Sequence, residues 1–229
     1  MTNIKARFIK HGNIKLGDMW TFSTLYGNDT FKTELGPVSG TCGHYCEGCK
    51  SACYVKKSYR YPSVIKSHAI NTLSLINSVM ETEKALTEQI ARARKKPSVI
   101  RIHQSGEMLN RYEVAMWLNI AKVFPQITFY TYTKAFDIVE PFINDLPNNF
   151  YINISVWHEL GIKEYEALKK HPNIKAFAYM DGFDYKAEGL DIETTCKAYE
   201  GGKLNHAITC DKCKKCFSKV FKIIGCESH

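Results

Sequence analysis

Nine cysteines carry the clearest chemistry in this chain, because thiolates bind metal ions and iron–sulfur clusters and act as nucleophiles. They form two groups, since residues 54–195 contain no cysteine. The first residues lack the apolar segment of a secretory signal, so we expect metal binding or catalysis rather than disulfides. The first group consists of Cys42, Cys46, Cys49 and Cys53, and the second of Cys196, Cys210, Cys213, Cys216 and Cys226.

The first group contains the spacing C-x3-C-x2-C, formed by Cys42, Cys46 and Cys49. Three thiolates on one tight loop can each bind one iron of a [4Fe–4S] cluster and leave the fourth iron open to another ligand. Cys53 is an additional thiol, so Cys42, Cys49 and Cys53 form an alternative triple that leaves Cys46 spare. Four cysteines within twelve residues can also close a tetrahedral zinc site. We expect a [4Fe–4S] cluster here, with zinc as the alternative.

The second group contains the spacing C-x2-C-x2-C, from Cys210 through Cys213 to Cys216, which is typical of ferredoxin-type clusters. We expect Cys196 to complete this site, with Cys226 as the alternative. Four thiolates leave no position open for chemistry. The site therefore acts either as an auxiliary iron–sulfur cluster or as a structural metal clip, iron–sulfur or zinc, that holds the C-terminal tail.

Regular alternation of strands and helices predicts the elements that position these thiols. Strand starts recur at intervals of roughly 25 residues, the length of a βα unit, which favours a parallel sheet. We expect an α/β protein: a partial (β/α) barrel or an open parallel sheet of about five to six strands, with a cysteine-rich C-terminal extension. The strands are predicted at 98–103, 127–133, 150–156 and 174–180, and the helices at 62–80, 82–95, 111–124, 136–144 and 163–170.

Three segments follow along the chain. Residues 1–41 are expected to form a strand or hairpin segment, with strand candidates at 19–26 and 30–35. Residues 42–185 form the (β/α) core with the first cysteine group, and residues 186–229 form the cysteine-rich metal-binding segment. Ligands of parallel α/β folds bind at the C-terminal ends of the strands, so polar residues there are candidates for the site.

The cysteine spacing, together with the segment Gln104-Ser105-Gly106-Glu107 that follows the strand 98–103, resembles the radical S-adenosylmethionine (SAM) superfamily. Members of that superfamily carry C-x3-C-x2-C after the first strand of a partial barrel and a GGE-like motif at the end of the second. The resemblance covers roughly residues 20–180. It implies a SAM-binding [4Fe–4S] cluster whose open iron is chelated by the methionine part of SAM.

The resemblance also implies roles for individual residues. Gly106 and Glu107, in the Ser105–Glu107 motif, would bind the amino group of SAM; a glycine lets the backbone approach the ligand, and a carboxylate pairs with an ammonium. Asn153 and Ser155, on a later strand, would contact the SAM carboxylate or ribose. Gly48 departs from the family, which usually has an aromatic residue just before the third cysteine.

A second resemblance extends over most of the chain. Cysteine-rich phage and mobile-element gene products share a TC…C…CY segment, an RIHxSG(D/E) strand, a YT-K stretch and a terminal C…C-x2-C-x2-C-(F/W) pattern. That family implies little about biochemical function. The corresponding segments here are residues 41–54, 101–107, 132–134 and 196–217.

Charge and composition limit the partners. The net charge is +8, from 31 basic and 23 acidic residues, and two clusters held by three and four thiolates would lower it to about +5. Basic residues concentrate near both cysteine groups, which indicates either support of thiolate-rich sites or a phosphate-binding surface for nucleic acid. No apolar run approaches the roughly 20 residues that span a bilayer, so we expect a cytoplasmic protein without a membrane partner.

Together these features favour a radical SAM-like enzyme that takes an electron from an electron donor and cleaves SAM to a 5′-deoxyadenosyl radical. No residue pattern indicates its substrate, its catalytic residues or its oligomeric state. The alternative is a non-catalytic iron–sulfur or zinc protein of a phage or mobile element that binds nucleic acid.

Overall fold

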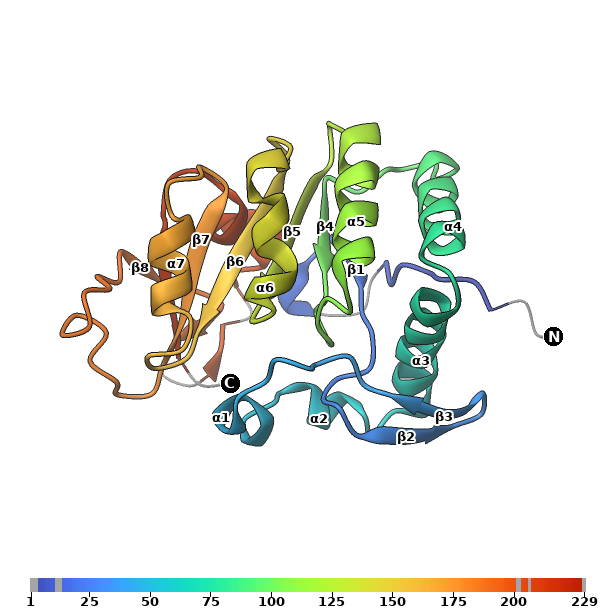
Figure 1. Cartoon of the computed structure of the whole chain (residues 1–229), viewed down its shortest axis with the longest axis horizontal. Helices are drawn as coiled ribbons and strands as arrows, with labels where there is room; N and C mark the ends of the chain where they lie inside the picture. Colours follow the sequence, from blue (N-terminus) through green and yellow to red (C-terminus); the bar gives the residue numbers. More distant parts are fainter. Residues whose placement is uncertain (1–3, 11–13, 201–202, 206, 228–229) are drawn as a thin grey trace.

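A seven-stranded sheet runs through the computed structural model, which describes residues 4–10, 14–200, 203–205 and 207–227 (Figure 1). The strand order is β1-β4-β5-β6-β7-β11-β8, and all neighbouring pairs are parallel. The predicted α/β class is confirmed, with seven strands instead of five or six. The strands are β1 (Trp20–Phe22), β4 (Val99–Ile102), β5 (Thr128–Thr133), β6 (Phe150–Val156), β7 (Ile174–Met180), β8 (Thr194–Thr195) and β11 (Ile223–Glu227).

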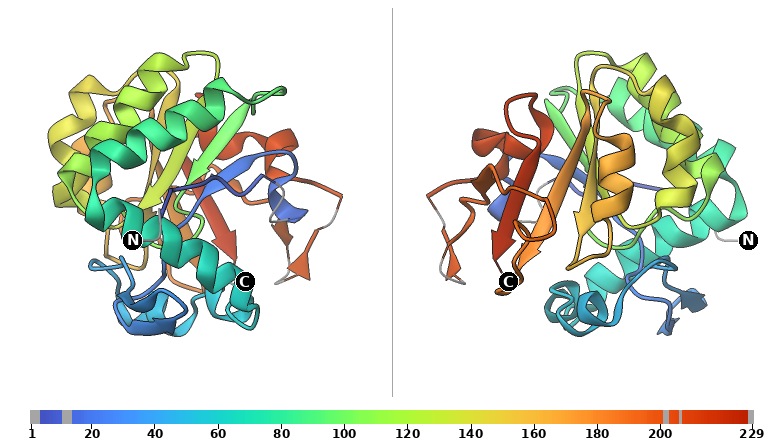
Figure 2. Two further views of the ribbon diagram at one scale, coloured as in Figure 1. Left: turned by 90° about the vertical axis from the view of Figure 1, so that its right-hand side faces the viewer. Right: turned by 60° about the vertical axis from the view of Figure 1, so that its left-hand side comes forward.

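Helices α5, α6 and α7 cover one face of this sheet, and α4 packs against α5 (Figures 1 and 2). Strands that follow one another along the chain are neighbours from β4 to β7. Because each strand–helix–strand crossover is right-handed in nearly all proteins, such an order places every crossover helix on the same side. The helices are α3 (Pro62–Asn77), α4 (Val79–Ala91), α5 (Arg111–Val123), α6 (Phe136–Val139) with η2 (Glu140–Asp145), and α7 (Ile162–Leu168).

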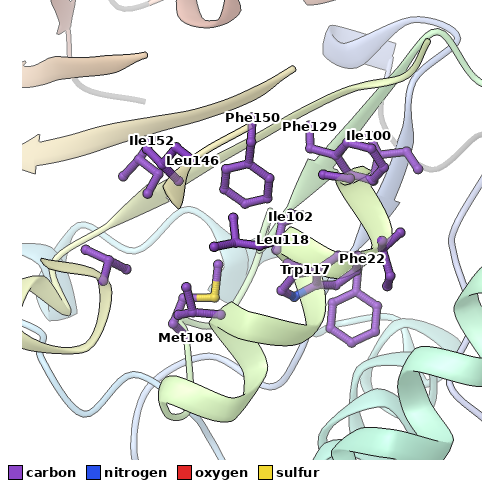
Figure 3. Packing of buried hydrophobic residues seen from close by; sticks show 14 of the residues in the cluster. Phe22, Ile100, Ile102, Met108, Trp117, Leu118, Phe129, Leu146, Phe150 and Ile152 are labelled. Carbon is purple, nitrogen blue, oxygen red and sulfur yellow. The ribbon is translucent and has the colours of Figure 1, made fainter. Parts of the chain in front are cut away.

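The main hydrophobic core lies between the sheet and these helices (Figure 3). Side chains alternate between the two faces of a strand, so Phe150 and Ile152 of β6 point to the same side. Trp117 of α5 is fully buried there, with its ring 5.0 Å from the ring of Phe22. This core fixes the sheet, and thereby the positions of the strand ends.

The opposite face of the sheet is covered by short elements from both ends of the chain. Tyr130 and Tyr151 face this side and pack with Leu16 and Phe217. Figure 2 shows the C-terminal segments on the side of the sheet away from the helices. The covering elements are η1 (Ile14–Leu16), α8 (Cys210–Cys213) and η3 (Lys215–Phe217).

The N-terminal segment differs from the prediction. The strand candidate 19–26 does not pair with 30–35; its residues 20–22 form β1, which lies beside β4 in the parallel sheet. All three residues of β1 are buried, although β1 is at the edge of the sheet, and an isolated antiparallel bridge from Ile9 to Thr21 covers its outer side. The hairpin consists of β2 (Thr30–Thr33) and β3 (Gly36–Ser39), and Gly36 has φ +96°, which favours glycine.

Strands from all three predicted segments enter the same sheet, because β1 precedes residue 42 and both β8 and β11 follow residue 186. A small pair of strands, β9 (Tyr199–Glu200) and β10 (Lys203–Leu204), lies outside it. Residues 1–3 and 11–13 of the first segment, and 201–202, 206 and 228–229 of the third, lie outside the described residues. In the described part of the chain, no helix combines the length and apolarity that a membrane crossing requires.

Candidate functional site

A pocket of about 280 Å³ opens at the C-terminal ends of the strands, on the sheet face away from the helices. This is the edge at which α1 (Glu47–Ser51) and α2 (Val55–Ser58) of the first cysteine group gather (Figure 1). Both cysteine groups contribute to its wall, although more than 140 residues of chain separate them. The thiol-bearing residues that line it are Cys42, Cys49, Cys53, Cys196, Cys210 and Cys216.

Within the first group, Cys46 has a different role from the other three cysteines. It is the N-cap of α1, and its sulfur accepts a hydrogen bond from Cys49 N at 3.4 Å. Cys46 does not line the pocket, whereas Cys42, Cys49 and Cys53 do. The thiols that face the pocket are therefore the alternative triple, not the three that form C-x3-C-x2-C.

Glu107 lies beside this triple, in the loop between β4 and α5. Its side chain is almost completely buried and lines the pocket. Its two carboxylate oxygens accept hydrogen bonds from Met108 N at 2.9 Å and from Lys134 N at 2.8 Å. Burial, and next to it the charge of Glu107, raise the pKa of Cys42 to about 12. The carboxylate is thus fixed by the backbone and close enough to act on the Cys42 thiol.

Two threonines join the Glu107 loop to the cysteine loop. Thr24 Oγ1 and Thr41 Oγ1 are 2.8 Å apart, and Glu107 N donates to Thr41 Oγ1 at 2.9 Å. Ser105 Oγ donates to Thr24 O at 2.9 Å. Thr41 directly precedes Cys42, so this network sets the base of the cysteine loop against the Ser105–Glu107 turn. Only the position of these threonines, at a strand end and beside a cysteine, marks them in the sequence.

Gly106 lines the pocket and also serves this packing. Its φ is +84°, and a Cβ at this position would lie 1.8 Å from Thr24 Oγ1. The prediction that the backbone of Gly106 lets a ligand approach stays a prediction. The atoms that approach Gly106 belong to Thr24 and Thr41.

A buried ion pair holds the other end of the same loop. His103, which directly follows β4 and has φ +52°, lies with Nε2 2.8 Å from Glu113 Oε1. Glu113 also accepts from Leu109 N at 2.8 Å and from Trp117 Nε1 at 3.1 Å. Burial lowers the pKa of His103, but the carboxylate of Glu113 outweighs it, so the pKa is raised overall. The loop from strand to helix is thus anchored at both ends.

The second cysteine group is attached to the edge of the sheet. Cys196 N donates to Gly225 O at 2.7 Å, and the neighbouring Cys226 lies buried in β11. A side-chain hydrogen bond to Cys196, followed by burial, raises the pKa of Cys226. Cys213 lines a second, more open depression on the surface and not the shared pocket. The structure thereby places both proposed fourth ligands, Cys196 and Cys226, next to each other.

Asn153 and Ser155 lie in different surroundings, although both are on β6. Ser155 lines the pocket. Asn153 is fully buried and donates from Nδ2 to Thr131 O and to Cys216 O, each at 3.1 Å. Of the two β6 residues that the resemblance assigns to SAM, the structure places only Ser155 on the pocket, and Asn153 supports the second cysteine group.

Aromatic rings form the wall between the two groups. Trp157 and Tyr179 stack with their ring centroids 3.9 Å apart, and Tyr132 meets Phe177 edge-on at 4.7 Å. A Cβ at Gly48 would lie 2.5 Å from Trp157 Nε1. The aromatic side chain that is missing at position 48 is thus replaced by an indole from the end of β6.

Burial favours the neutral, protonated form of the pocket thiols Cys210 and Cys216. Burial raises the pKa of Cys210, and it raises the pKa of Cys216 to about 12. Among the described residues, no three His, Cys, Asp or Glu side chains are grouped so that they could hold one metal ion. The arrangement offers thiols from two loops, a fixed carboxylate and aromatic walls around one pocket.

Comparison with known proteins places the chain in a family. A family model described as Gene product 88 (GP88) matches residues 7–219, so the chain belongs to this family. The Gene 88 protein of Mycobacterium phage L5 is 24% identical over 139 residues, which cover 55% of this chain and 58% of the phage protein. No solved structure matches the chain. The predicted resemblance to phage gene products is confirmed, and neither match points to SAM chemistry.

Proposed function

We propose that this member of the gene product 88 family is an iron–sulfur enzyme that binds a [4Fe–4S] cluster through Cys42, Cys49 and Cys53 and SAM in the pocket beside it. One observation carries the proposal: these three thiols and the fixed carboxylate of Glu107 line one pocket at the C-terminal ends of parallel strands. Parallel α/β folds bind their ligands at this edge.

When bound, a cluster with one iron free of thiolate supplies the electron that cleaves SAM to methionine and a 5′-deoxyadenosyl radical. The residues of the chain bind and orient SAM. Glu107 accepts one backbone hydrogen bond on each oxygen and keeps further lone pairs for an ammonium group. Ser155 offers a hydroxyl from β6, and the stacked rings of Trp157 and Tyr179 exclude water from the wall.

We assign the second cysteine group to a separate site with Cys196, Cys210, Cys213 and Cys216 as ligands, iron–sulfur or zinc, and Cys226 as the alternative to Cys196. Its attachment to β11 supports a structural role, because a bound ion would fasten the C-terminal segment to the sheet edge. Its place on the same pocket also supports electron transfer toward the first group.

The experiment is purification without oxygen, followed by iron and sulfide analysis, SAM titration and detection of 5′-deoxyadenosine after addition of a reductant. We expect about four irons per cluster and formation of 5′-deoxyadenosine. Glu107→Ala should weaken SAM binding by about tenfold or more, because it removes a charge-assisted hydrogen bond. Unchanged SAM affinity in this variant, with the cluster intact, would falsify the role of Glu107.

A second candidate function is a metal-clipped protein that binds nucleic acid. It is favoured by the phage relative and by the net charge of +8. Under this alternative the oxygen-free protein contains stoichiometric zinc, does not bind SAM, and binds DNA or RNA with an affinity that falls steeply with salt. The iron, zinc and SAM measurements above therefore decide between the two functions.

A further inference from the structure

Arg101 lies on the floor of the shared pocket without a carboxylate partner. It is on β4, with its guanidinium carbon 4.8 Å from the ring centroid of Tyr132. Its Nη2 donates to Tyr54 Oη at 3.4 Å, while its Nε is sealed from solvent and has no hydrogen-bond partner in the described part of the chain. Tyr54 itself donates to Gln104 O. None of the ion pairs among the described residues includes Arg101.

The charges around the pocket are unequal. Lys15, Arg101 and Lys134 line it, whereas the only carboxylate among its described lining residues is Glu107. Both oxygens of Glu107 already accept backbone hydrogen bonds. A guanidinium keeps its charge at every physiological pH, and a covered charge without a counter-charge destabilises a protein. The part of the pocket beside Arg101 therefore favours a ligand group that brings negative charge.

The shape and chemistry of the wall indicate the rest of the ligand. The rings of Tyr132 and Phe177 and those of Trp157 and Tyr179 lie on the same pocket as Arg101. Such rings stack on flat aromatic groups. Lys134, whose Nζ lies 5.9 Å from the Trp157 ring centroid, adds a second cation on this wall.

We propose that the substrate of this pocket carries an oxyanion, carboxylate or phosphate, which Arg101 binds, and a flat ring that lies along the aromatic wall. The inference rests on the proposed function only in naming this ligand as the substrate that accompanies SAM. Two molecules can supply an oxyanion to Arg101, the substrate and SAM through its carboxylate, and the experiment must distinguish them. Arg101 also lies near Cys210, so the competing role for Arg101 is to balance the negative charge of the second cysteine group.

The experiment compares uridine monophosphate with uridine, which differ in the oxyanion alone, by calorimetry on the oxygen-free protein with its bound metal. We expect the monophosphate to bind at least tenfold more tightly. Arg101→Gln should bring the two affinities to within about twofold, and Arg101→Lys should retain part of the preference because it keeps the charge but loses the planar fork. Lys219→Gln removes an exposed charge outside the pocket and should change nothing.

Each outcome has a defined meaning. Equal affinity of the wild type for both probes, or a preference that survives in Arg101→Gln, overturns the proposal. The proposal also fails if Arg101→Gln alters only the metal content, which would assign Arg101 to the second cysteine group. Unaltered circular dichroism of both Arg101 variants shows that they fold. If Arg101→Gln does not fold, Arg101→Lys still tests the proposal through its reduced preference for the monophosphate.

A second arm repeats the titrations with saturating SAM. A preference for the monophosphate that persists assigns the oxyanion to the substrate, and a preference that disappears assigns Arg101 to the SAM carboxylate and overturns the proposal. The 5′-deoxyadenosine assay is independent of these titrations. Without SAM cleavage but with an Arg101-dependent preference, the oxyanion site stands and the proposed enzymatic function falls.

Discussion

The two cysteine groups open to the same pocket but are held in different ways. The first lies on a loop with two short helices outside the sheet, between β3 and α3. The second is bound to the sheet itself, through Cys226 within β11 and the hydrogen bond from Cys196 N to Gly225 O. Asn153 adds a hydrogen bond to Cys216 O from the middle of the sheet. A loop thus positions the thiols of the first group, whereas the sheet positions those of the second.

The charges next to the two groups are opposite. The carboxylate of Glu107 raises the pKa of Cys42, in addition to burial. At Cys210, burial raises the pKa, and the guanidinium of Arg101 opposes it. A carboxylate favours a cationic ligand at the first group, and a guanidinium favours negative charge beside the second. The two halves of the pocket therefore suit different chemical groups.

The largest expected effect comes from serine substitutions in the two groups. We expect Cys53→Ser and Cys216→Ser each to lose one cluster, about four irons per chain. Cys46→Ser is the matched control, because Cys46 caps α1 and does not line the pocket; it should keep its iron. Loss of iron in Cys46→Ser with retention in Cys53→Ser would restore C-x3-C-x2-C as the ligand set.

The same variants should separate in stability. Cys216→Ser should lower the melting temperature more than Cys53→Ser, because the second site ties the C-terminal segment to the sheet and metal binding to a structural site is folding free energy. Calorimetry on the metal-loaded proteins measures both. Equal losses of stability in the two variants would contradict a structural role that is specific to the second site.

Metal affinity should depend on pH at both groups. Burial raises the pKa of Cys42 and of Cys216 to about 12, so both thiols hold a proton at neutral pH and must release it to bind metal. Lower pH therefore favours the metal-free form. Metal affinity should increase about tenfold for each unit of increase in pH, for each such thiol. Competition between Co²⁺ and a chelator at pH 6.5, 7.5 and 8.5 measures the slope, and a flat profile contradicts the assignment of protonated thiols.

Gly48→Ala should disturb the first group alone. The new Cβ would lie 2.5 Å from Trp157 Nε1, so the indole or the cysteine loop must shift, at a cost of about 1–3 kcal/mol. We expect faster iron loss from the first site to a chelator and unchanged retention at the second. Adding Trp157→Ala should relieve the clash; a double variant as unstable as the single one would show that Trp157 is not the obstacle.

The smallest expected effect distinguishes the two polar residues of β6. Asn153→Ala removes the hydrogen bond to Cys216 O and should lower the free energy of unfolding by about 1 kcal/mol while SAM affinity stays constant. Ser155→Ala should weaken SAM binding and leave stability unchanged, because Ser155 lines the pocket. Urea unfolding and SAM titration of both variants check this, and the reverse pattern would return Asn153 to the SAM site.

Local sequence signals predicted the strands with strong boundaries. The predicted strands 150–156 and 174–180 coincide with β6 and β7, because each is an apolar run that follows a proline and an asparagine. Two strands near the C-terminus, β8 and β11, were not predicted, and β1 lies inside the strand candidate 19–26 but was expected in a hairpin. β8 has two residues and β1 three, and β11 contains Gly225, so the pairing with distant strands decides their conformation.

The sequence by itself determined the α/β class, the two thiol groups and the loop that carries Glu107, because these depend on composition and on periodicity within short windows. Only the tertiary structure decided that Cys46 caps a helix, that Asn153 supports Cys216 and that Arg101 has no carboxylate partner among the described residues. The second and third of these depend on which distant segments meet at the pocket. Spacing along the chain does not specify that meeting, since it arises from the packing of the sheet against both ends of the chain.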